Sequence, residues 1–156
     1  MEMELKIPAL AELSFRQTLL ADTETMRYNE KWGGTLSFPE EKWASWYARW
    51  VAPADRSHFY RYLHTPEDGF VGDAAYHYDE ELGAWLADVI VLAAFRGRGY
   101  GRAGLRLLCA AARENGLKTL CDTIALDNAP ALALFQSEGF CETRRTEEYA
   151  LVELQL

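Results

Sequence analysis

The feature that most constrains this chain is the segment Arg96-Gly97-Arg98-Gly99-Tyr100-Gly101, in which three glycines occupy alternate positions. It follows the largely apolar run from Trp85 to Leu92, and the apolar residues between Leu105 and Ala112 then recur at the spacing of an amphipathic helix. Glycines let backbone N–H groups turn inward without a Cβ in the way, and a helix N-terminus adds the positive end of its dipole. This strand, loop and helix therefore predict a cradle for an anion.

Three cations surround the predicted cradle, because Arg96, Arg98 and Arg102 fall within seven residues of a chain whose net charge is −8. This suits a pyrophosphate better than a single carboxylate. The sequence has no Gly-Lys-Ser/Thr, which excludes a nucleoside triphosphate loop. The spacing from Gly99 to Gly104 formally matches a dinucleotide-binding fingerprint, with Asp122 beyond it. That motif, however, lies past the middle of a short chain, after strands that we expect to be antiparallel, which argues against a nicotinamide site.

The order of the predicted elements indicates an α+β fold. Turn signals and apolar periodicity divide the chain into two N-terminal helical segments, three strands, a helix, a strand, a helix and two strands. The helices are predicted over 10–20, with a broken continuation to 29, and over 39–50, 101–114 and 130–138; the strands over 58–64, 70–78, 85–92, 119–126, 140–145 and 149–154. This order predicts a mixed sheet, not a long alternating series of parallel strands.

Composition excludes several other classes of protein. The start Met1-Glu2-Met3-Glu4 is acidic, so we expect no signal peptide. No apolar stretch reaches about 18 residues, so we also expect no membrane span. We therefore predict a cytoplasmic protein. The net charge of −8 argues against nucleic acid and mildly favours a cationic partner. No CxxC spacing is present, so we expect no metal and no disulfide, and three buried, reduced thiols at Cys109, Cys121 and Cys141.

Two segments carry a family resemblance. Residues 91–101 resemble the acetyl-CoA motif of the GNAT N-acetyltransferases, a strand followed by Arg/Gln-x-x-Gly-x-Gly/Ala, with Ala93 where many members have proline. Residues 128–140 resemble the family's Asn-x-x-Ala-x-x-Leu-Tyr-x-x-x-Gly-Phe stretch. The resemblance implies one GNAT-like domain over 1–156, with a mixed, mostly antiparallel sheet of six to seven strands and about four helices. Residues 1–57 would be the variable helices on the substrate side, and 58–156 the sheet and cofactor core.

The implied activity is direct transfer of an acetyl group from acetyl-CoA to a primary amine of a small molecule or peptide. The alternative is a non-catalytic acyl-CoA-binding or regulatory module, and a homodimer is one option for its assembly. By the resemblance, the pantetheine arm would enter between the strand before the loop and the strand after the central helix. The implied acetyl-CoA-binding residues are Val89, Ile90, Val91, Arg96, Gly97, Arg98, Gly99, Tyr100, Gly101, Arg102, Asn128, Ala131, Leu132 and Phe135.

The implied reaction needs a base, because an alkylammonium with a pKa of about 10.4 must lose its proton at a cost of roughly 4.6 kcal/mol at pH 7. Asp88 is the first candidate, since a carboxylate interrupts an apolar strand there and its pKa is expected to be raised. Hydrogen bonding or exposure to solvent would explain this residue equally well. Weaker candidates for the base are Glu30, Asp73, His77, Glu80 and Glu81.

The leaving thiolate poses a second proton problem, because Phe135 occupies the position where many family members have a proton-donating tyrosine. A thiol with a pKa near 8.5 leaves as thiolate at a cost of about 2 kcal/mol at pH 7, so the loss weakens catalysis without preventing it. Tyrosines that could substitute are Tyr28, Tyr47, Tyr100 and Tyr149. The aromatic residues of the N-terminal helices could enclose an amine by cation–π contact or pack as core; they include Trp32, Trp43, Trp46 and Trp50.

Overall fold

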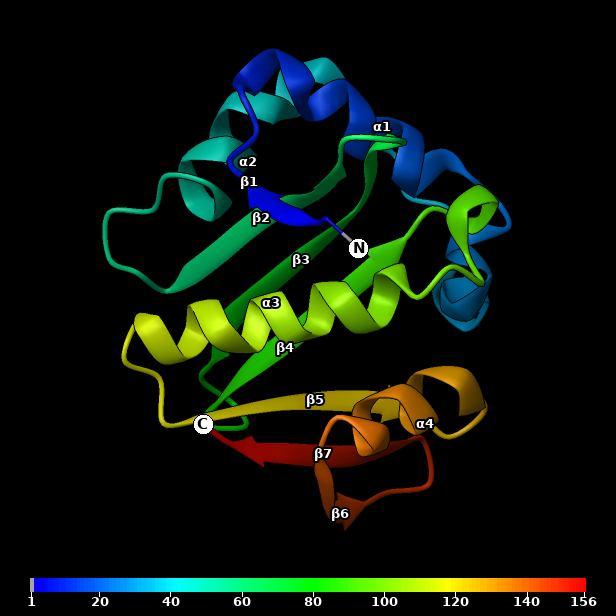
Figure 1. Cartoon of the computed structure of the whole chain (residues 1–156), viewed down its shortest axis with the longest axis vertical. Helices are drawn as coiled ribbons and strands as arrows, with labels where there is room; N and C mark the ends of the chain where they lie inside the picture. Colours follow the sequence, from blue (N-terminus) through cyan, green and yellow to red (C-terminus); the bar gives the residue numbers. More distant parts are fainter. Residues whose placement is uncertain (1) are drawn as a thin grey trace.

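A seven-stranded sheet with the strand order β1-β2-β3-β4-β5-β7-β6 forms the centre of the computed structural model, which describes residues 2–156 (Figure 1). The strands are β1 (Glu4–Lys6), β2 (His58–Thr65), β3 (Gly69–Asp79), β4 (Ala84–Val91), β5 (Thr119–Ala125), β6 (Cys141–Arg145) and β7 (Tyr149–Gln155). The α-helices are α1 (Leu13–Ala21), α2 (Trp43–Trp50), α3 (Tyr100–Glu114) and α4 (Ala129–Ser137). Short 3-10 segments are η1 (Leu10–Glu12), η2 (Thr25–Trp32), η3 (Glu40–Lys42) and η4 (Ala93–Phe95).

The joint between β4 and β5 is the feature of the sheet that matters most for function. Neighbouring strands pair antiparallel everywhere in the sheet except here, where two parallel strands share one register pair, Leu86 with Cys121. Beyond this pair the strands diverge, and their C-terminal ends leave a cleft. A single parallel pair cannot build the repeated βαβ units of a dinucleotide-binding fold. The α+β prediction is therefore confirmed, and the fingerprint from Gly99 to Gly104 has no Rossmann context.

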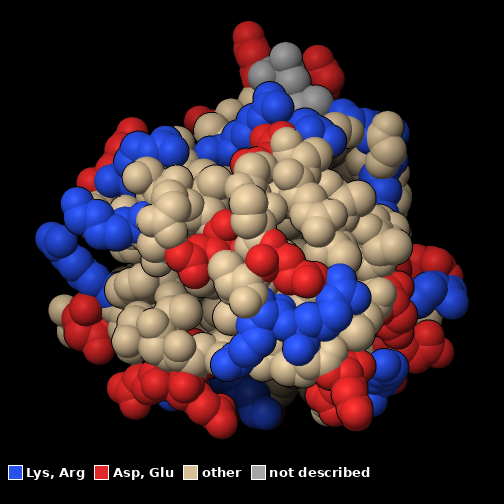
Figure 2. All heavy atoms as spheres, turned by 90° about the horizontal axis from the view of Figure 1, so that it is seen from below, with Lys and Arg blue, Asp and Glu red and all other residues tan. Residues whose placement is uncertain are grey.

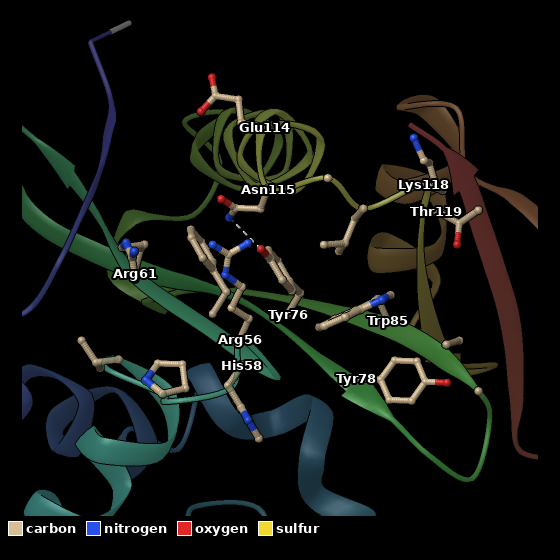
Figure 3. Close-up of a pocket in the computed structure, with 17 residues that line it drawn as sticks. Arg56, His58, Arg61, Tyr76, Tyr78, Trp85, Glu114, Asn115, Lys118 and Thr119 are labelled. Carbon is tan, nitrogen blue, oxygen red and sulfur yellow. Dashed lines mark hydrogen bonds between the residues drawn. The ribbon is translucent and has the colours of Figure 1, made fainter.

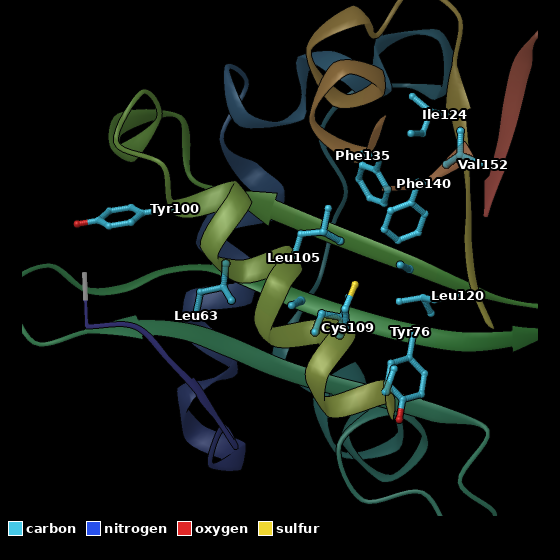
Figure 4. Packing of buried hydrophobic residues seen from close by; sticks show 14 of the residues in the cluster. Leu63, Tyr76, Tyr100, Leu105, Cys109, Leu120, Ile124, Phe135, Phe140 and Val152 are labelled. Atoms are coloured by element: carbon cyan, nitrogen blue, oxygen red, sulfur yellow. The ribbon is translucent and has the colours of Figure 1, made fainter. Parts of the chain in front are cut away.

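Helices cover both faces of the sheet. Helix α3 packs on β3 and β4 (Figures 1 and 4). Leu105, Leu108 and Ala112 on its apolar side are fully buried. Alternate strand residues point to the opposite face, where Tyr60, Tyr62 and other side chains meet the aromatic residues of α2. Towards the C-terminal part of the sheet, the principal cluster continues through Leu120, Ile124, Phe135, Phe140 and Val152.

The N-terminal region departs most from the sequence prediction. The predicted segment 10–20 forms η1 and α1, and its broken continuation forms the 3-10 segment η2. Sequence reasoning missed β1, a three-residue edge strand too short for an alternating pattern. Cys109 and Cys121 are buried as expected, whereas the prediction for Cys141 is wrong: this thiol is exposed because β6 is the opposite edge strand and all of its residues face solvent.

Charged side chains of both signs share the surface. On the end that carries β6 and β7, Lys and Arg side chains are interspersed with Asp and Glu and form no single basic face (Figure 2). Within residues 2–156, no helix is long and apolar enough to cross a membrane. Across the same residues, no cluster of three His, Cys, Asp or Glu side chains is placed to hold a metal ion.

Candidate active site

The divergence of β4 and β5 opens a cleft of about 630 Å³. One wall is the C-terminal half of β4 and the loop that follows it, the other is β5 with the start of α4, and η2 closes one side. Such a volume falls within the usual range for small-molecule sites. The lining residues are Tyr28, Asn29, Trp32, Asp88, Val89, Ile90, Val91, Phe95, Arg96, Gly97, Gly99, Tyr100, Gly101, Asp122, Thr123, Ile124, Ala125, Asn128, Pro130, Ala131, Leu134 and Phe135.

The glycine loop has the conformation of an anion cradle. Gly97 and Gly99 have φ angles of 80° and 81°, a region that residues with a Cβ rarely adopt. Gly99 caps α3, and the first bond that closes the helix runs from the Ala103 amide to the Gly99 carbonyl oxygen at 3.1 Å. The amides at the preceding helix positions have no intrahelical acceptor, so the positive end of a 15-residue helix faces the loop.

The three arginines of the motif make contacts that sequence reasoning did not predict. Arg96 donates to the Thr25 carbonyl oxygen at 3.0 Å and thereby links the loop to η2. Arg98 pairs with Asp68 at 3.0 Å, and Arg102 pairs with Glu138 at 2.9 Å. Arg98 and Arg102 lie outside the cleft lining, whereas Arg96 lines the cleft. The acceptor of its hydrogen bond is the neutral carbonyl oxygen of Thr25, so this bond does not neutralise the charge of Arg96.

The β4 wall of the cleft depends on a close contact with β3. A Cβ at Gly72 would stand 2.0 Å from the Ile90 carbonyl oxygen, well inside any van der Waals contact. The Leu92 amide also donates to the Val71 carbonyl oxygen at 2.8 Å. Only glycine lets β3 approach β4 this closely, so position 72 fixes where the wall of the cleft lies.

A second cavity of about 300 Å³ opens on the side of α1 and α2. It shares Asp88, Asp122 and Thr123 with the cleft, so the two spaces meet at these residues. The other lining residues are Arg16, Trp46, Trp50, Tyr60, Ala75, His77, Leu86 and Ala87. A molecule in the cleft and another in this cavity would meet at two carboxylates.

Both carboxylates at the junction have perturbed acidity. Asp88 reaches solvent through the opening, yet protein crowds it on its other sides, and this desolvation raises its pKa although Arg16 opposes the shift. Burial and, secondly, the charge of Asp88 raise the pKa of Asp122 well above its ordinary value. Asp122 was missed as a catalytic candidate. The available signal is the one that identified Asp88, a carboxylate inside an apolar strand.

A third carboxylate, Asp73, lies next to the cavity in a closed network. It is 1% exposed, accepts a hydrogen bond of 2.5 Å from the Tyr60 hydroxyl, and stands 3.4 Å from Arg16 Nη1. Desolvation outweighs the attraction of Arg16 and raises the pKa of Asp73 to about 7. Its oxygen is occupied by protein donors, so Asp88 and Asp122 are the carboxylates available at the junction.

The aromatic helix contributes to both core and cavity. Trp43 is buried and donates to the Phe38 carbonyl oxygen at 3.0 Å. Trp46 and Trp50 stack with ring centroids 6.0 Å apart and line the second cavity. The guanidinium carbon of Arg16 lies 4.3 Å from the centroid of a Trp46 ring, so the chain's own cation already occupies this aromatic face.

The candidate proton donors differ in whether they line the cleft and in whether their hydroxyl groups are already hydrogen-bonded. Phe135 lines the cleft, packs edge-on against Phe140 at 4.9 Å and offers no hydroxyl. The hydroxyl of Tyr47 donates to the Pro8 carbonyl oxygen at 2.7 Å, and that of Tyr100 to Asp68 at 2.5 Å. Tyr149 lies outside the cleft lining, and within residues 2–156 the hydroxyl of Tyr28 has no hydrogen-bond partner. Tyr28 lines the cleft, and desolvation raises its pKa.

The remaining sequence candidates lie in different environments. Glu30, Glu80 and Glu81 are exposed and outside both spaces. His77 lines the second cavity, where its ring stacks on His58 at 5.9 Å. Leu132 packs against the principal core, and the neighbouring apolar residue that faces the cleft is Leu134.

Splayed parallel strands beside a glycine cradle at a helix N-terminus define an acyl-CoA-dependent N-acyltransferase fold. The acetyltransferase (GNAT) family model matches residues 19–140, and the chain belongs to this family. It is an acetyl-CoA-dependent N-acetyltransferase, as the two motifs predicted. No curated protein matches the chain in sequence.

Solved structures share the fold at low identity. A spermidine N-acetyltransferase from Vibrio cholerae, in complex with CoA and spermine, aligns with a TM-score of 0.79 and 15% identity over 98% of this chain and 95% of its own. The putative acetyltransferase YncA from Salmonella typhimurium, with acetyl-CoA, has a TM-score of 0.77 and 19% identity, and 99% and 94% of the chains are covered. The PaiA N-acetyltransferase from Thermoplasma acidophilum, with coenzyme A, has a TM-score of 0.72 and 9% identity over both whole chains.

Proposed function

We propose that acetyl-CoA occupies the cleft and that a small cationic amine approaches its thioester from the second cavity. The observation that supports this most is that the two spaces meet at Asp88, Asp122 and Thr123. The pantetheine arm would lie along Val89 to Val91, whose backbone groups beyond the Leu86 pair have no partner on β5. The pyrophosphate would meet the amides between Gly97 and Gly101, within the positive field of Arg96.

In this proposal Asp88 is the general base. It accepts a proton from the acceptor's ammonium group, and the free amine then forms the C–N bond as the C–S bond breaks. The pKa of Asp88 is raised and is therefore closer to the pKa of an amine than the pKa of an ordinary aspartate is. This smaller difference favours proton transfer from the amine. The departing thiolate takes a proton from Tyr28, the candidate tyrosine on the cleft whose hydroxyl is uncommitted among residues 2–156.

The size and charge of the second cavity favour a compact amine. At about 300 Å³ it is small, and two carboxylates face it while the charge of Arg16 is directed to Asp73. The charge of the ionised Asp88 would attract a protonated amine and hold it in this cavity. Because one fold neighbour is a spermidine N-acetyltransferase, polyamines belong in the first assay panel, with monoamines, amino acids and N-terminal peptides beside them.

Replacement of the base tests this assignment. We expect Asp88→Asn to lower kcat at least tenfold and to leave the KM for acetyl-CoA within about twofold, because general-base catalysis typically contributes 10²–10⁴-fold. Glu81→Gln removes an exposed carboxylate from the β3–β4 turn and serves as the matched control. Full activity of Asp88→Asn would place the base elsewhere. Failure of every amine to release CoA would favour the non-catalytic module.

Location and assembly remain proposals as well. The three cysteines are free thiols, and two of them are buried with pKa values that burial raises to about 11, which fits a reducing compartment. We therefore propose the cytoplasm as the site of action. The homodimer remains a prediction, which light scattering of the full chain can test.

A further inference from the structure

A third and larger cavity of about 780 Å³ lies at the other end of β4. Its β4 residues are Ala84 and Trp85, whereas Asp88 to Val91 line the acetyl-CoA cleft. At about 3.3 Å per residue, Trp85 is about 10 Å from Asp88 along the strand, and the odd spacing places their side chains on opposite faces. The cavity is therefore separate from the proposed site of acetyl transfer.

The cavity is lined by cations. Arg56, Arg61 and Lys118 contribute to its wall, and Glu114 is its single acidic lining residue. Figure 3 shows Glu114 on the outer side of α3, directed away from the cavity, and the guanidinium of Arg56 directed inward beside Tyr76. In a chain with a net charge of −8, this local excess of positive charge favours an anionic ligand.

Arg56 has two properties of a ligand-binding group. Within residues 2–156, neither Arg56 nor Lys118 has an acidic partner at ion-pair distance. Among residues 2–156, Arg56 is also the non-glycine residue with a positive φ, 61°, a strained conformation that clusters at functional sites. The strained backbone presents a free guanidinium to the cavity.

Aromatic side chains form another part of the wall. Phe59 and Tyr76 stack with their rings 4.8 Å apart, and Trp85 meets Tyr76 edge-on at 5.7 Å and Tyr78 at 5.2 Å. Asn115 donates to the Tyr76 hydroxyl at 2.8 Å and holds that ring in place (Figure 3). Fixed aromatic rings offer a flat apolar surface to a planar ligand.

We propose that this cavity binds a small planar aromatic carboxylate, with its ring against Trp85 and Tyr78 and its carboxylate on Arg56. A guanidinium pairs with a carboxylate through two parallel hydrogen bonds, and the aromatic wall accepts the ring. The cavity also spans the sheet joint, because β2, β3 and β4 line one side and the end of α3 and the start of β5 line the other. The ligand thus contacts both halves of the sheet that the Leu86–Cys121 pair connects.

Calorimetry of the full chain with 2-naphthoate tests the proposal, with the acetyl-CoA cleft saturated by CoA. Neutral 2-naphthamide and 2-naphthyl phosphate are the comparison ligands. We expect 2-naphthoate to bind at least tenfold more tightly than the amide and more tightly than the phosphate. We expect Arg56→Gln to weaken its binding at least tenfold, and Trp85→Leu to weaken it severalfold.

Arg113→Gln is the matched control, because it removes the same charge from an exposed position of α3 that lies outside the cavity lining. We expect it to change the affinity less than twofold. An equal loss of 2-naphthoate affinity in Arg56→Gln and Arg113→Gln would show that only the net charge of the protein matters and would overturn the proposed binding site. Absence of 2-naphthoate binding would overturn it too, as would preferential binding of the amide or the phosphate.

Discussion

The guanidinium of Arg96 donates a hydrogen bond of 3.0 Å to the carbonyl oxygen of Thr25, 71 residues earlier in the chain. The Thr25 side chain completes the connection, because its hydroxyl accepts from the Ala93 amide at 2.8 Å and donates to Asp22. Two reciprocal contacts therefore hold η2, which carries Tyr28, against the cofactor loop. The arginine expected at the pyrophosphate thus also holds the segment that carries the proposed proton donor.

Thr25→Val tests this connection. The variant keeps the shape of the buried Thr25 side chain but leaves the partly buried Ala93 amide without its acceptor, which typically costs about 1–3 kcal/mol. We expect the free energy of unfolding in urea to fall by that amount and the KM for acetyl-CoA to rise. Thr18→Val, on the exposed side of α1, should change stability by less than about 0.5 kcal/mol. Equal stability of the two variants would contradict the prediction.

Gly72→Ala should damage the cleft without touching the ligand. The new Cβ would stand 2.0 Å from the Ile90 carbonyl oxygen, so the β4 backbone must move and acetyl-CoA binding should weaken at least tenfold, as measured by calorimetry. Gly104→Ala is the control, because its Cβ would meet the end of the Leu63 side chain at 2.8 Å, and a side chain yields more easily than a backbone. Similar affinities in both variants would show that the β4 wall tolerates displacement.

The pH dependence of kcat/KM should identify which carboxylate of the junction ionises for catalysis. The rate should rise with pH as Asp88 loses its proton, with an inflection above the ordinary pKa of an aspartate. Burial and, secondly, the charge of Asp88 raise the pKa of Asp122, so we expect Asp88 to ionise first and Asp122→Asn to leave this limb within about half a pH unit. A larger displacement would show that Asp122 is the charged member of the pair.

Tyr28→Phe should lower kcat about thirtyfold, because an unprotonated thiolate leaves at a cost of about 2 kcal/mol at pH 7. Phe135→Tyr restores a hydroxyl at the opposite wall of the cleft and should recover part of the rate in the double variant. Stopped-flow measurement of CoA release compares the three enzymes. An unchanged rate in Tyr28→Phe would assign thiolate protonation to solvent.

The Asp73 carboxyl makes stability depend on pH. Its pKa of about 7 lies above the ordinary value of 3.8, so the folded state binds a proton that the unfolded state releases between these values. The associated stability is present at low pH and is lost as pH rises to about 7. When the pH falls from 8 to 5.5, the free energy of unfolding of the wild type, measured in urea, should rise by about 2 kcal/mol relative to that of Asp73→Asn. Parallel stability curves would show that Asp73 stays ionised.

The sequence by itself determined the cofactor class and the order of the elements. Alternate glycines after an apolar strand restrict what the backbone can do, and the resemblance of the Asn128–Phe140 segment to the GNAT family narrows the predicted ligand from an anion to acetyl-CoA. These signals are local, so they can be read without coordinates. The apolar periodicities likewise located six strands and the central helix, because burial of one face imposes a period of 2 or 3.6 residues.

Only the tertiary structure decided which side chains meet. The single pair between Leu86 and Cys121 sets where the sheet opens, and the resulting cleft brings Asp122 beside Asp88 from a strand more than 30 residues later. In the folded structure Arg98 pairs with Asp68, where sequence reasoning predicted a phosphate contact, and Arg16 lies on Trp46, for which the sequence left both an amine contact and core packing open. The partner of a charged side chain depends on long-range packing and desolvation, and neither is encoded in the spacing of neighbouring residues.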